Sequence, residues 1–248
     1  MRKFGLIGYP LEHSYSYTYF NGKFMLGGID AVYDNYPLKS LSDLRRLVED
    51  EGLDGFNVTV PHKINVIEQL DDIDIHADII GAVNVVKVED VDGYKFLKGY
   101  NTDYLAFRAS IIPLMQPQHV SALVLGTGGA AHAVAYALTE MGIECVFVSR
   151  KDCAEGVLYS EVDERMMSRF KIIVNCTPVG MWPKANARPK LPYAALTAEH
   201  LLYDLIYNPE QTKFLTAGIK AGAQVKNGLE MLHRQADLSW EIWNGHAG

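Results

Sequence analysis

The stretch that most constrains the fold is a glycine-rich turn between an apolar run and an alanine-rich run, at residues 123–131. The apolar run ends at Leu125, and Gly126, Gly128 and Ala131 then follow the spacing G-x-G-x-x-G/A. In that pattern the first glycine permits a tight turn, the second lets a phosphate approach the backbone, and the small third residue lets a helix pack on the sheet. The stretch predicts a strand, turn and helix that bind a dinucleotide at the helix N-terminus. A tight turn without a ligand is the alternative.

Strand-like runs recur after this turn and predict a doubly wound parallel sheet. They lie at residues 122–125, 145–148, 172–176 and 201–206, with a long alanine-rich helix between the first two. This alternation is typical of a Rossmann-like nucleotide-binding domain. We assign that domain to residues 104–227, because the pattern restarts after about residue 103.

The first hundred residues also alternate strands and helices, which predicts a second α/β domain with a mixed sheet at residues 1–103. Asp92-Gly93 lies between two strand-like runs and is a strong hairpin signal. A final helix is expected within residues 228–248. Its apolar stripe consists of Leu229, Leu232, Ala236, Trp240 and Trp243.

The residues after the strand at 145–148 favour one nicotinamide cofactor over the other. A cofactor without a 2′-phosphate usually finds an acidic residue there, which binds the ribose diol. This chain instead has Ser149, Arg150 and Lys151, a hydroxyl and two cations that suit a phosphate. The sequence therefore favours NADP over NAD, unless Arg150 and Lys151 are merely solvated loop charges.

Two polar runs end in charged side chains that suit proton transfer. Residues 57–63 read NVTVPHK and end in Lys63, and residues 99–103 read GYNTD and end in Asp103. An ammonium group beside a carbonyl oxygen can stabilise negative charge and deliver a proton, and a carboxylate can anchor that ammonium. We predict Lys63 and Asp103 as the catalytic pair, against the alternative that both are surface charges.

Neutral donors near these runs suit a polyhydroxylated acid. Asn57 and Thr59 are expected on one strand face, and Ser14 and Ser16 follow the first strand. Helix capping is the alternative for the two serines.

The histidines do not indicate a metal site. His13 and His62 are interpreted as packing or hydrogen-bonding residues, and His132 has no metal partner at useful spacing. We therefore expect no metal.

Composition excludes several functional classes. The net charge of -7 argues against nucleic-acid binding, which needs a basic face. No run approaches the ~20 apolar residues of a membrane span, and the apolar run at the N-terminus is too short for a signal peptide. The three cysteines, Cys145, Cys153 and Cys176, are odd in number and do not predict a disulfide framework. We expect a cytoplasmic protein.

Ordered motifs along nearly the whole chain resemble the shikimate dehydrogenase family. They include the runs at 57–63, 99–103 and 126–131 and extend from the first strand to the last helix. The remaining motifs are Gly8–Ser16, Gly81–Asn84, Asn175–Met181, Tyr203–Pro209 and Asn227–Leu232 with Gln235. The resemblance implies NADP-dependent, reversible reduction of 3-dehydroshikimate to shikimate, in aromatic amino acid biosynthesis. The oligomeric state stays open, with a homodimer among the alternatives.

The resemblance also implies residue roles that the pattern alone does not show. Lys63 and Asp103 match the catalytic pair of the family. The implied substrate-binding residues are Ser14, Ser16, Thr59, Asn84, Tyr207 and Gln235. The implied cofactor-binding residues are Gly126, Thr127, Gly128, Gly129, Ala130, Ser149, Arg150, Thr177, Met181, Leu205 and Gly228.

The chain departs from the family pattern at two places. Tyr17 replaces the proline that usually follows the second serine, and the loop at 149–151 keeps only the arginine of the usual Asn-Arg-Thr. Only 24 residues separate Arg150 from Asn175, so a helix of the cofactor domain is expected to be trimmed. The rival functions are a quinate/shikimate dehydrogenase that uses NAD, and a nucleotide-sensing protein without catalysis on the same fold.

Overall fold

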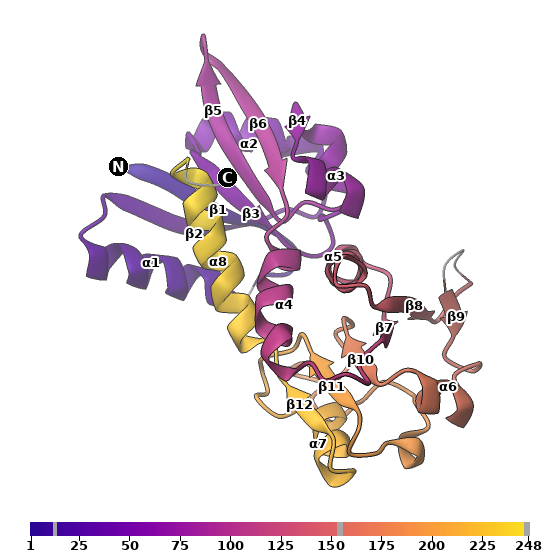
Figure 1. The fold of residues 1–248 in the computed structure, drawn as a ribbon. Coiled ribbons are helices and arrows are strands. Elements are labelled where there is room, and N and C mark those ends of the chain that lie inside the picture. Colours follow the sequence, from indigo (N-terminus) through magenta and orange to yellow (C-terminus); the bar gives the residue numbers. More distant parts are fainter. Residues whose placement is uncertain (12–13, 153–155, 246–248) are drawn as a thin grey trace. The chain divides into compact units, whose positions relative to one another are not determined.

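The computed structural model describes residues 1–11, 14–152 and 156–245; His13 and Cys153 lie outside the described residues. The chain divides into two compact units, one of residues 1–102 with 235–248 and one of residues 103–234. Each unit contains its own six-stranded sheet with helices around it (Figure 1). The predicted α/β class is confirmed.

The first unit contains a mixed sheet. Its elements are β1 (Arg2–Gly8), α1 (Tyr15–Gly27), β2 (Ala31–Pro37), a 3-10 turn (Leu41–Asp43), α2 (Leu44–Glu51), β3 (Gly55–Val58), a second 3-10 turn (Asn65–Gln69), β4 (Asp72–Ile73), α3 (Ile75–Ile80), β5 (Val85–Val91) and β6 (Tyr94–Tyr100). The strand order is β2-β1-β3-β5-β6-β4. Strand β1 pairs in parallel with β2 and β3, whereas β5 pairs antiparallel with β3 and β6. This is the mixed sheet that the sequence predicts.

The predicted hairpin joins β5 to β6. Asp92 and Gly93 have φ values of 53° and 85°, as a two-residue type I′ turn requires. The resulting register places Leu97 opposite Val88, with the Leu97 side chain fully buried. Helix α3 is capped at its C-terminal end by Gly81, which has φ 68°. Residues 82–84 connect this helix to β5, which begins at Val85.

An aromatic cluster joins the start of the first unit to the last helix, α8 (Leu229–Trp243). The Trp243 ring stacks on Phe4 with a centroid distance of 4.5 Å and lies 5.3 Å from Phe20. Its indole N–H donates to the carbonyl of Val86 at 3.0 Å. Gly55 leaves room for the indole, because a Cβ there would lie 2.4 Å from the indole nitrogen. The apolar stripe of the final helix thus ends in the core of the first unit.

The second unit contains a parallel, doubly wound sheet. Its elements are α4 (Asp103–Ile111), a 3-10 turn (Ile112–Leu114), β7 (Ser121–Leu125), α5 (Gly129–Glu140), β8 (Glu144–Ser149), β9 (Gly156–Leu158), α6 (Glu164–Arg169), β10 (Ile172–Asn175), a 3-10 turn (Tyr193–Ala195), β11 (Leu201–Asp204), α7 (Lys213–Lys220), β12 (Gln224–Lys226) and the first part of α8. The strand order is β12-β11-β10-β7-β8-β9, and every neighbouring pair is parallel. Numbered from β7, this is the Rossmann order 3-2-1-4-5-6, with its switch point between β7 and β10.

The edges of this sheet differ from the sequence prediction. Strands β9 and β12 have three residues each, too few to show a periodic pattern, and the sequence analysis did not predict them. Six residues connect Ser149 to Gly156, whereas a parallel crossover normally needs a dozen or more and usually a helix. Residues 150–152, the described part of this connection, are not helical. A shortened connection after Arg150 is what the sequence predicts.

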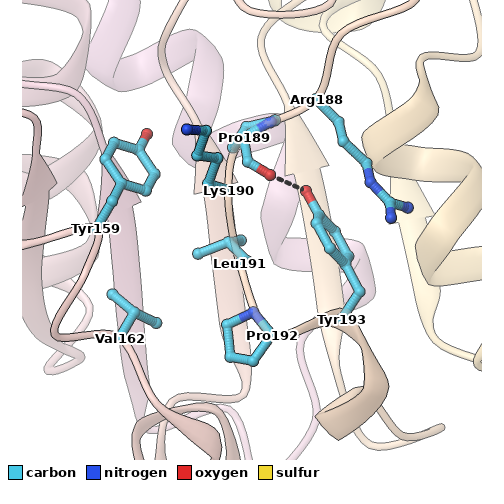
Figure 2. A pocket seen from close by; sticks show the side chains of 8 residues that line it. All are labelled: Tyr159, Val162, Arg188, Pro189, Lys190, Leu191, Pro192 and Tyr193. Carbon is cyan, nitrogen blue, oxygen red and sulfur yellow. Dashed lines mark hydrogen bonds between the residues drawn. The ribbon is translucent and has the colours of Figure 1, made fainter.

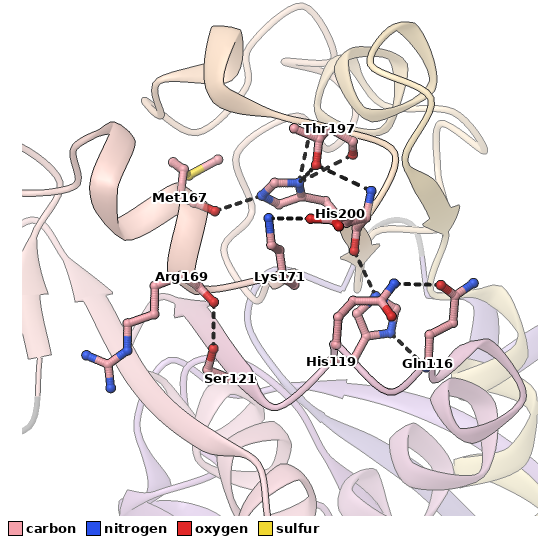
Figure 3. A network of polar contacts seen from close by, with 10 residues as sticks. Gln116, His119, Ser121, Met167, Arg169, Lys171, Thr197 and His200 are labelled. Atoms are coloured by element: carbon pink, nitrogen blue, oxygen red, sulfur yellow. Dashed lines mark hydrogen bonds and ion pairs between the residues drawn. The ribbon is translucent and has the colours of Figure 1, made fainter.

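Two buried histidines hold loops together where the strands of the second sheet begin (Figure 3). In His119 and in His200, Nδ1 accepts a hydrogen bond from the backbone N–H three residues earlier, at 3.0 Å in both cases. The ring proton therefore sits on Nε2. His119 donates it to the carbonyl of Glu199 at 3.1 Å, and His200 to the carbonyl of Met167 at 2.8 Å.

Acidic pH should destabilise the protein through these two histidines. Burial lowers the pKa of His119 and His200 below 6.5, and a proton added at Nδ1 would face the N–H that donates to it. Below about pH 6.5 the unfolded chain then binds more protons than the folded one. Below about pH 6.5 we therefore expect the free energy of unfolding to decrease as the pH is lowered, by at most ~1.4 kcal/mol per pH unit for each histidine. Thermal or urea unfolding between pH 5 and 8 measures this dependence.

A double variant provides the control for this prediction. His119→Asn with His200→Gln lacks both titrating rings and should lose less stability on acidification than the wild type. His76→Gln removes a histidine outside the network and should keep the wild-type dependence. An unchanged dependence in the double variant would assign the acid sensitivity to other groups.

Candidate functional site

A chain of buried hydrogen bonds runs through the first unit and includes a predicted substrate-binding residue. The hydroxyl of Ser16, in the first turn of α1, bonds to the hydroxyl of Tyr33. Tyr33 donates to Oδ1 of Asn57 at 2.9 Å, and Asn57 donates to Oγ of Ser239 at 2.9 Å. Burial raises the pKa of Tyr33 well above its ordinary value, so the phenol stays a neutral donor. The side-chain amide of Asn57 is thus engaged inside the protein, contrary to its expected role as a substrate donor.

Two predicted substrate-binding residues, Asn84 and Gln235, lie together in this interior. Oδ1 of Asn84 accepts from the backbone N–H of Thr102 at 2.7 Å, and its Nδ2 donates to Oγ1 of Thr102 at 2.9 Å. Oε1 of Gln235, on α8, accepts from the same Nδ2 at 3.4 Å. Thr102, with 1% of its surface exposed, was missed as a site residue. Its position directly before Asp103 in the run at 99–103 was the available signal.

The predicted catalytic lysine is anchored by its main chain. The carbonyl of Lys63 accepts from the N–H of Val83 at 2.8 Å, next to Asn84. The preceding His62 is buried, and its Nε2 lies 2.7 Å from the carbonyl of Leu38. This contact confirms His62 as a hydrogen-bonding residue of the fold. Lys63 itself is half-buried, which suits an ammonium group that must be both positioned and accessible.

Ser14 has a buried hydroxyl to which no other described residue forms a hydrogen bond. It occupies the N-cap position of α1 without a side-chain capping bond, so the capping alternative is wrong for Ser14. Its Oγ has no hydrogen-bond partner among the described residues. A buried hydroxyl without a partner costs free energy unless a ligand or water satisfies it. This supports a ligand-binding role for Ser14.

Thr59 lies just past β3, not within it. The strand ends at Val58, so Thr59 does not share a strand face with Asn57, contrary to the prediction. Its N–H still donates to the carbonyl of Ile7 at 2.9 Å. A Cβ at Gly8 would lie 2.4 Å from Cγ2 of Thr59, so the glycine makes room for this side chain.

The predicted catalytic acid begins a helix of the second unit. Asp103 is the first residue of α4, with 4% of its surface exposed. The N-terminal end of a helix carries partial positive charge and favours a carboxylate. The sequence analysis placed only a soft domain boundary here, and α4 was not predicted.

The glycine-rich turn lies at the switch point of the second sheet. It connects β7 to α5, and the neighbouring loop follows β10. Gly126 has φ 106°, and a Cβ there would lie 3.1 Å from Cγ2 of Thr177. The space around Gly128 is open, and Ala131 is 1% exposed against the sheet. This is the geometry predicted for a turn that presents helix N–H groups to a phosphate.

A buried network shapes the loop that carries Thr177. Oδ1 of Asn175 accepts from the N–H and hydroxyl of Thr177 at 3.1 and 2.7 Å. Nδ2 of Asn175 donates to Asp204 at 2.9 Å, and Asp204 also accepts from Thr212 at 2.6 Å. Burial raises the pKa of Asp204 to about 6, so its carboxylate is the main form at neutral pH. The sequence analysis assigned no site role to Asp204 or Asn175.

Further predicted cofactor residues lie at the carboxyl ends of the neighbouring strands. Leu205 follows β11, and its N–H donates to the carbonyl of Asn175 at 3.0 Å. Gly228 follows β12, and a Cβ there would lie 2.0 Å from the carbonyl oxygen of Leu205. Met181, in the loop after β10, is 45% exposed, and Tyr207, after β11, is half-buried.

The end of β8 presents two cations. Arg150 and Lys151 are exposed, and the Lys151 N–H donates to Oγ of Ser149 at 3.1 Å. Neither residue forms an ion pair with the described part of the chain. The residues at this strand end therefore fit a dinucleotide with an additional phosphate, as predicted.

Two features are absent from residues 1–11, 14–152 and 156–245. No group of three or more metal-ligating side chains was found among those residues. None of their helices combines the length and the apolar composition that crossing a membrane requires.

Fold and site together define a Rossmann-type dinucleotide-binding protein that carries a second α/β unit. The sequence model described as "Shikimate dehydrogenase substrate binding domain" matches residues 6–86. A shikimate dehydrogenase (NADP(+)) of Methanococcus maripaludis is 35% identical, over 97% of this chain and 90% of that protein. The chain belongs to the shikimate dehydrogenase family.

Solved structures of this family are similar over the whole chain. The enzyme of Thermus thermophilus, in complex with NADP(H) and shikimate, has a TM-score of 0.85 and 33% identity, over 99% of this chain and 94% of that one. A quinate dehydrogenase of Corynebacterium glutamicum, in complex with NAD, also has a TM-score of 0.85, at 25% identity over 98% of this chain and 94% of that one. The fold alone therefore does not distinguish the two substrates.

The predicted site residues fall into two groups. Ser14, Ser16, Thr59, Lys63, Asn84 and Gln235 belong to the first unit, and hydrogen bonds join Asn84 to Gln235. Asp103, Tyr207 and the cofactor-binding residues belong to the second unit. Asp103 begins α4, whereas the others lie at or near the carboxyl ends of the strands of that unit. The roles of the individual residues remain predictions.

Proposed function

We propose that this protein is an NADP-dependent shikimate dehydrogenase, which reversibly reduces 3-dehydroshikimate to shikimate in aromatic amino acid biosynthesis. The observation that carries the proposal is the likeness to shikimate dehydrogenases (NADP(+)) over 97% of the chain, at 35% identity. The exposed Arg150 and Lys151 after β8 support NADP as the cofactor.

We assign the substrate to residues 1–103, completed by 228–248, and the dinucleotide to residues 104–227. The hydroxyls of Ser14 and Ser16 suit the carboxylate of the substrate, and the unused Oγ of Ser14 supports this role. Thr59, Asn84 and Gln235 suit its ring hydroxyls, with Tyr207 as a further contact.

NADPH, when bound, supplies the hydride that reduces the ketone. The ammonium of Lys63 donates a proton to the carbonyl oxygen of the substrate as that oxygen becomes a hydroxyl. We assign to the carboxylate of Asp103 the role of accepting a hydrogen bond from a substrate hydroxyl, which would orient the substrate. In the reverse direction, the neutral amine of Lys63 takes the hydroxyl proton. The glycine-rich turn from Gly126 to Ala130 binds the pyrophosphate with backbone N–H groups.

We place the enzyme in the cytoplasm. The free thiols of Cys145 and Cys176 support a reducing compartment. A homodimer is the oligomeric alternative to a monomer, and sedimentation velocity separates them.

The two rival functions differ from the proposed one in measurable ways. A quinate/shikimate dehydrogenase would oxidise quinate with NAD, and a nucleotide-sensing protein would bind NADP without turning over either acid. The retention of both Lys63 and Asp103 favours an enzyme over a sensor.

A spectrophotometric assay of shikimate and quinate, each with NADP and with NAD, tests the proposal. We expect kcat/KM to be highest for shikimate with NADP, by at least about tenfold over the other three combinations, as one lost charge-assisted contact would give. Faster oxidation of quinate with NAD would support the first rival. NADP binding without turnover of either acid would support the second.

A further inference from the structure

A pocket of about 400 Å³ in the second unit has no role in the site described above. It lies between the loop after β9 and the connection from β10 to β11, and is lined by Tyr159, Val162, Arg188, Pro189, Lys190, Leu191, Pro192 and Tyr193 (Figure 2). Two of its lining residues are cations, two are phenols and none is a carboxylate. In a chain with a net charge of -7, such a lining favours an anion that also has a flat ring.

The pocket adjoins the end of β8. The N–H of Tyr159 donates to the carbonyl of Ser149 at 3.1 Å. Ser149 and Leu158 form the last pair of the parallel ladder, and Arg150 and Tyr159 directly follow them in the chain. The pKa of Tyr159, which burial raises to about 12, is lowered in part by the charge of Arg150. The phenol therefore lies within electrostatic reach of the guanidinium.

The ends of β8 and β9 pack on the same hydrophobic cluster as the pocket lining. Val148 and Val157 form a pair in the ladder, and both belong to the cluster that includes Tyr159, Leu191 and Tyr193. The short connection from β8 to β9 contributes no described helix that would cover this side.

Lys190 and Arg188 contribute differently to the pocket. The guanidinium of Arg188 lies 4.1 Å from the centre of the Tyr193 ring, and the Tyr193 hydroxyl donates to the carbonyl of Pro189 at 2.8 Å. These contacts hold one wall in place. Lys190 is exposed and forms no ion pair with a described residue. In Figure 2 its ammonium is on the side of the pocket where Tyr159 lies.

We propose that Lys190 and Tyr159 form a second determinant of NADP specificity, which binds the 2′-phosphate end of the adenosine together with Arg150. This inference rests on the proposed function. Lys190 supplies a second positive charge to the phosphate, the Tyr159 hydroxyl supplies a neutral donor, and the pocket receives part of the adenosine.

Calorimetric titration with 2′,5′-ADP and with 5′-AMP tests this inference without catalysis. Lys190→Ala should weaken 2′,5′-ADP by about 10- to 100-fold, as expected for one charge-assisted hydrogen bond, and leave 5′-AMP within about twofold. Tyr159→Phe keeps the ring and should weaken 2′,5′-ADP by about tenfold, because its hydroxyl would be a neutral donor to an ionised phosphate. Lys184→Ala, an exposed lysine of the same connection outside the pocket, is the matched control and should bind both as the wild type does.

Three results would overturn the inference. If Lys190→Ala bound 2′,5′-ADP with wild-type affinity, Lys190 would not contact the 2′-phosphate. If the variant lost equal affinity for both nucleotides, the contact would not be specific for the 2′-phosphate. Binding of 2′,5′-ADP that NADP does not compete away would make the pocket a separate anion site. Turnover of shikimate by the wild type, assayed in parallel, reports on the proposed function independently.

Discussion

Replacing Lys63 by alanine should lower kcat for shikimate oxidation by about 10²- to 10⁴-fold, the usual contribution of a positioned acid or base. The variant lacks the group that delivers or takes the proton at the substrate oxygen, while the glycine-rich turn and Arg150 are untouched. Binding of NADP should therefore stay within about twofold of the wild type, since no charge-assisted contact to the cofactor is lost. Steady-state kinetics give kcat, and calorimetric titration gives the affinity for NADP.

Two further variants make this prediction specific. Lys95→Ala removes a lysine at the hairpin, where it pairs with Asp90, and should leave kcat unchanged. If Lys63 and Asp103 act as one unit, Lys63→Ala with Asp103→Ala should be little slower than Lys63→Ala alone. Near-wild-type turnover in Lys63→Ala would remove the assigned role, and fully additive losses would separate the two residues.

Replacing Arg150 by alanine should raise KM for NADP by about 10- to 100-fold and change KM for NAD by less than about threefold. The guanidinium is expected to bind the 2′-phosphate, which NAD lacks, and a charge-assisted contact of this kind contributes about 1.5–3 kcal/mol. Steady-state kinetics with each cofactor, at saturating shikimate, give both constants.

Lys151→Ala is the matched control, because Lys151 is also exposed and carries the same charge one residue further on. Its effect should be smaller, since an ammonium does not make the bidentate phosphate contact of a guanidinium. Equal losses for NADP and NAD in Arg150→Ala would contradict the phosphate contact and leave the solvated-loop alternative.

Much of the fold could be predicted from local patterns. The turn at Asp92-Gly93 and the glycine at 126 occur where the chain needs positive φ, and both signals are independent of the rest of the molecule. The strands β4, β9 and β12 have two or three residues each, which is too short to show alternation of apolar and polar residues. Only their pairing with neighbouring strands defines them. The helix α4 was missed at the soft boundary that the sequence analysis placed between the domains.

The candidate site could be predicted only in part, for a similar reason. Lys63 and Asp103 stand out because each ends a polar run after a strand. The hydrogen-bond partners of Asn57 do not stand out in the sequence. Tyr33 and Ser239 are 24 and 182 residues away, and no local pattern marks either one as a partner. The same holds for Asp204 and Thr212, which shape the loop of Thr177 through buried side chains.

By itself the sequence determined the class of each half of the chain and the tight glycine-rich turn, and it predicts the charges that would select the cofactor. These depend on residue type and on spacing within about ten positions, where backbone sterics and hydrophobic periodicity act. Only the tertiary structure decided which polar side chains bond to other residues of the fold, such as Asn57, and which have no hydrogen-bond partner among the described residues, such as Ser14. That distinction depends on burial and on partners far apart in the sequence, because a buried hydroxyl or amide is satisfied by whatever the fold brings to it.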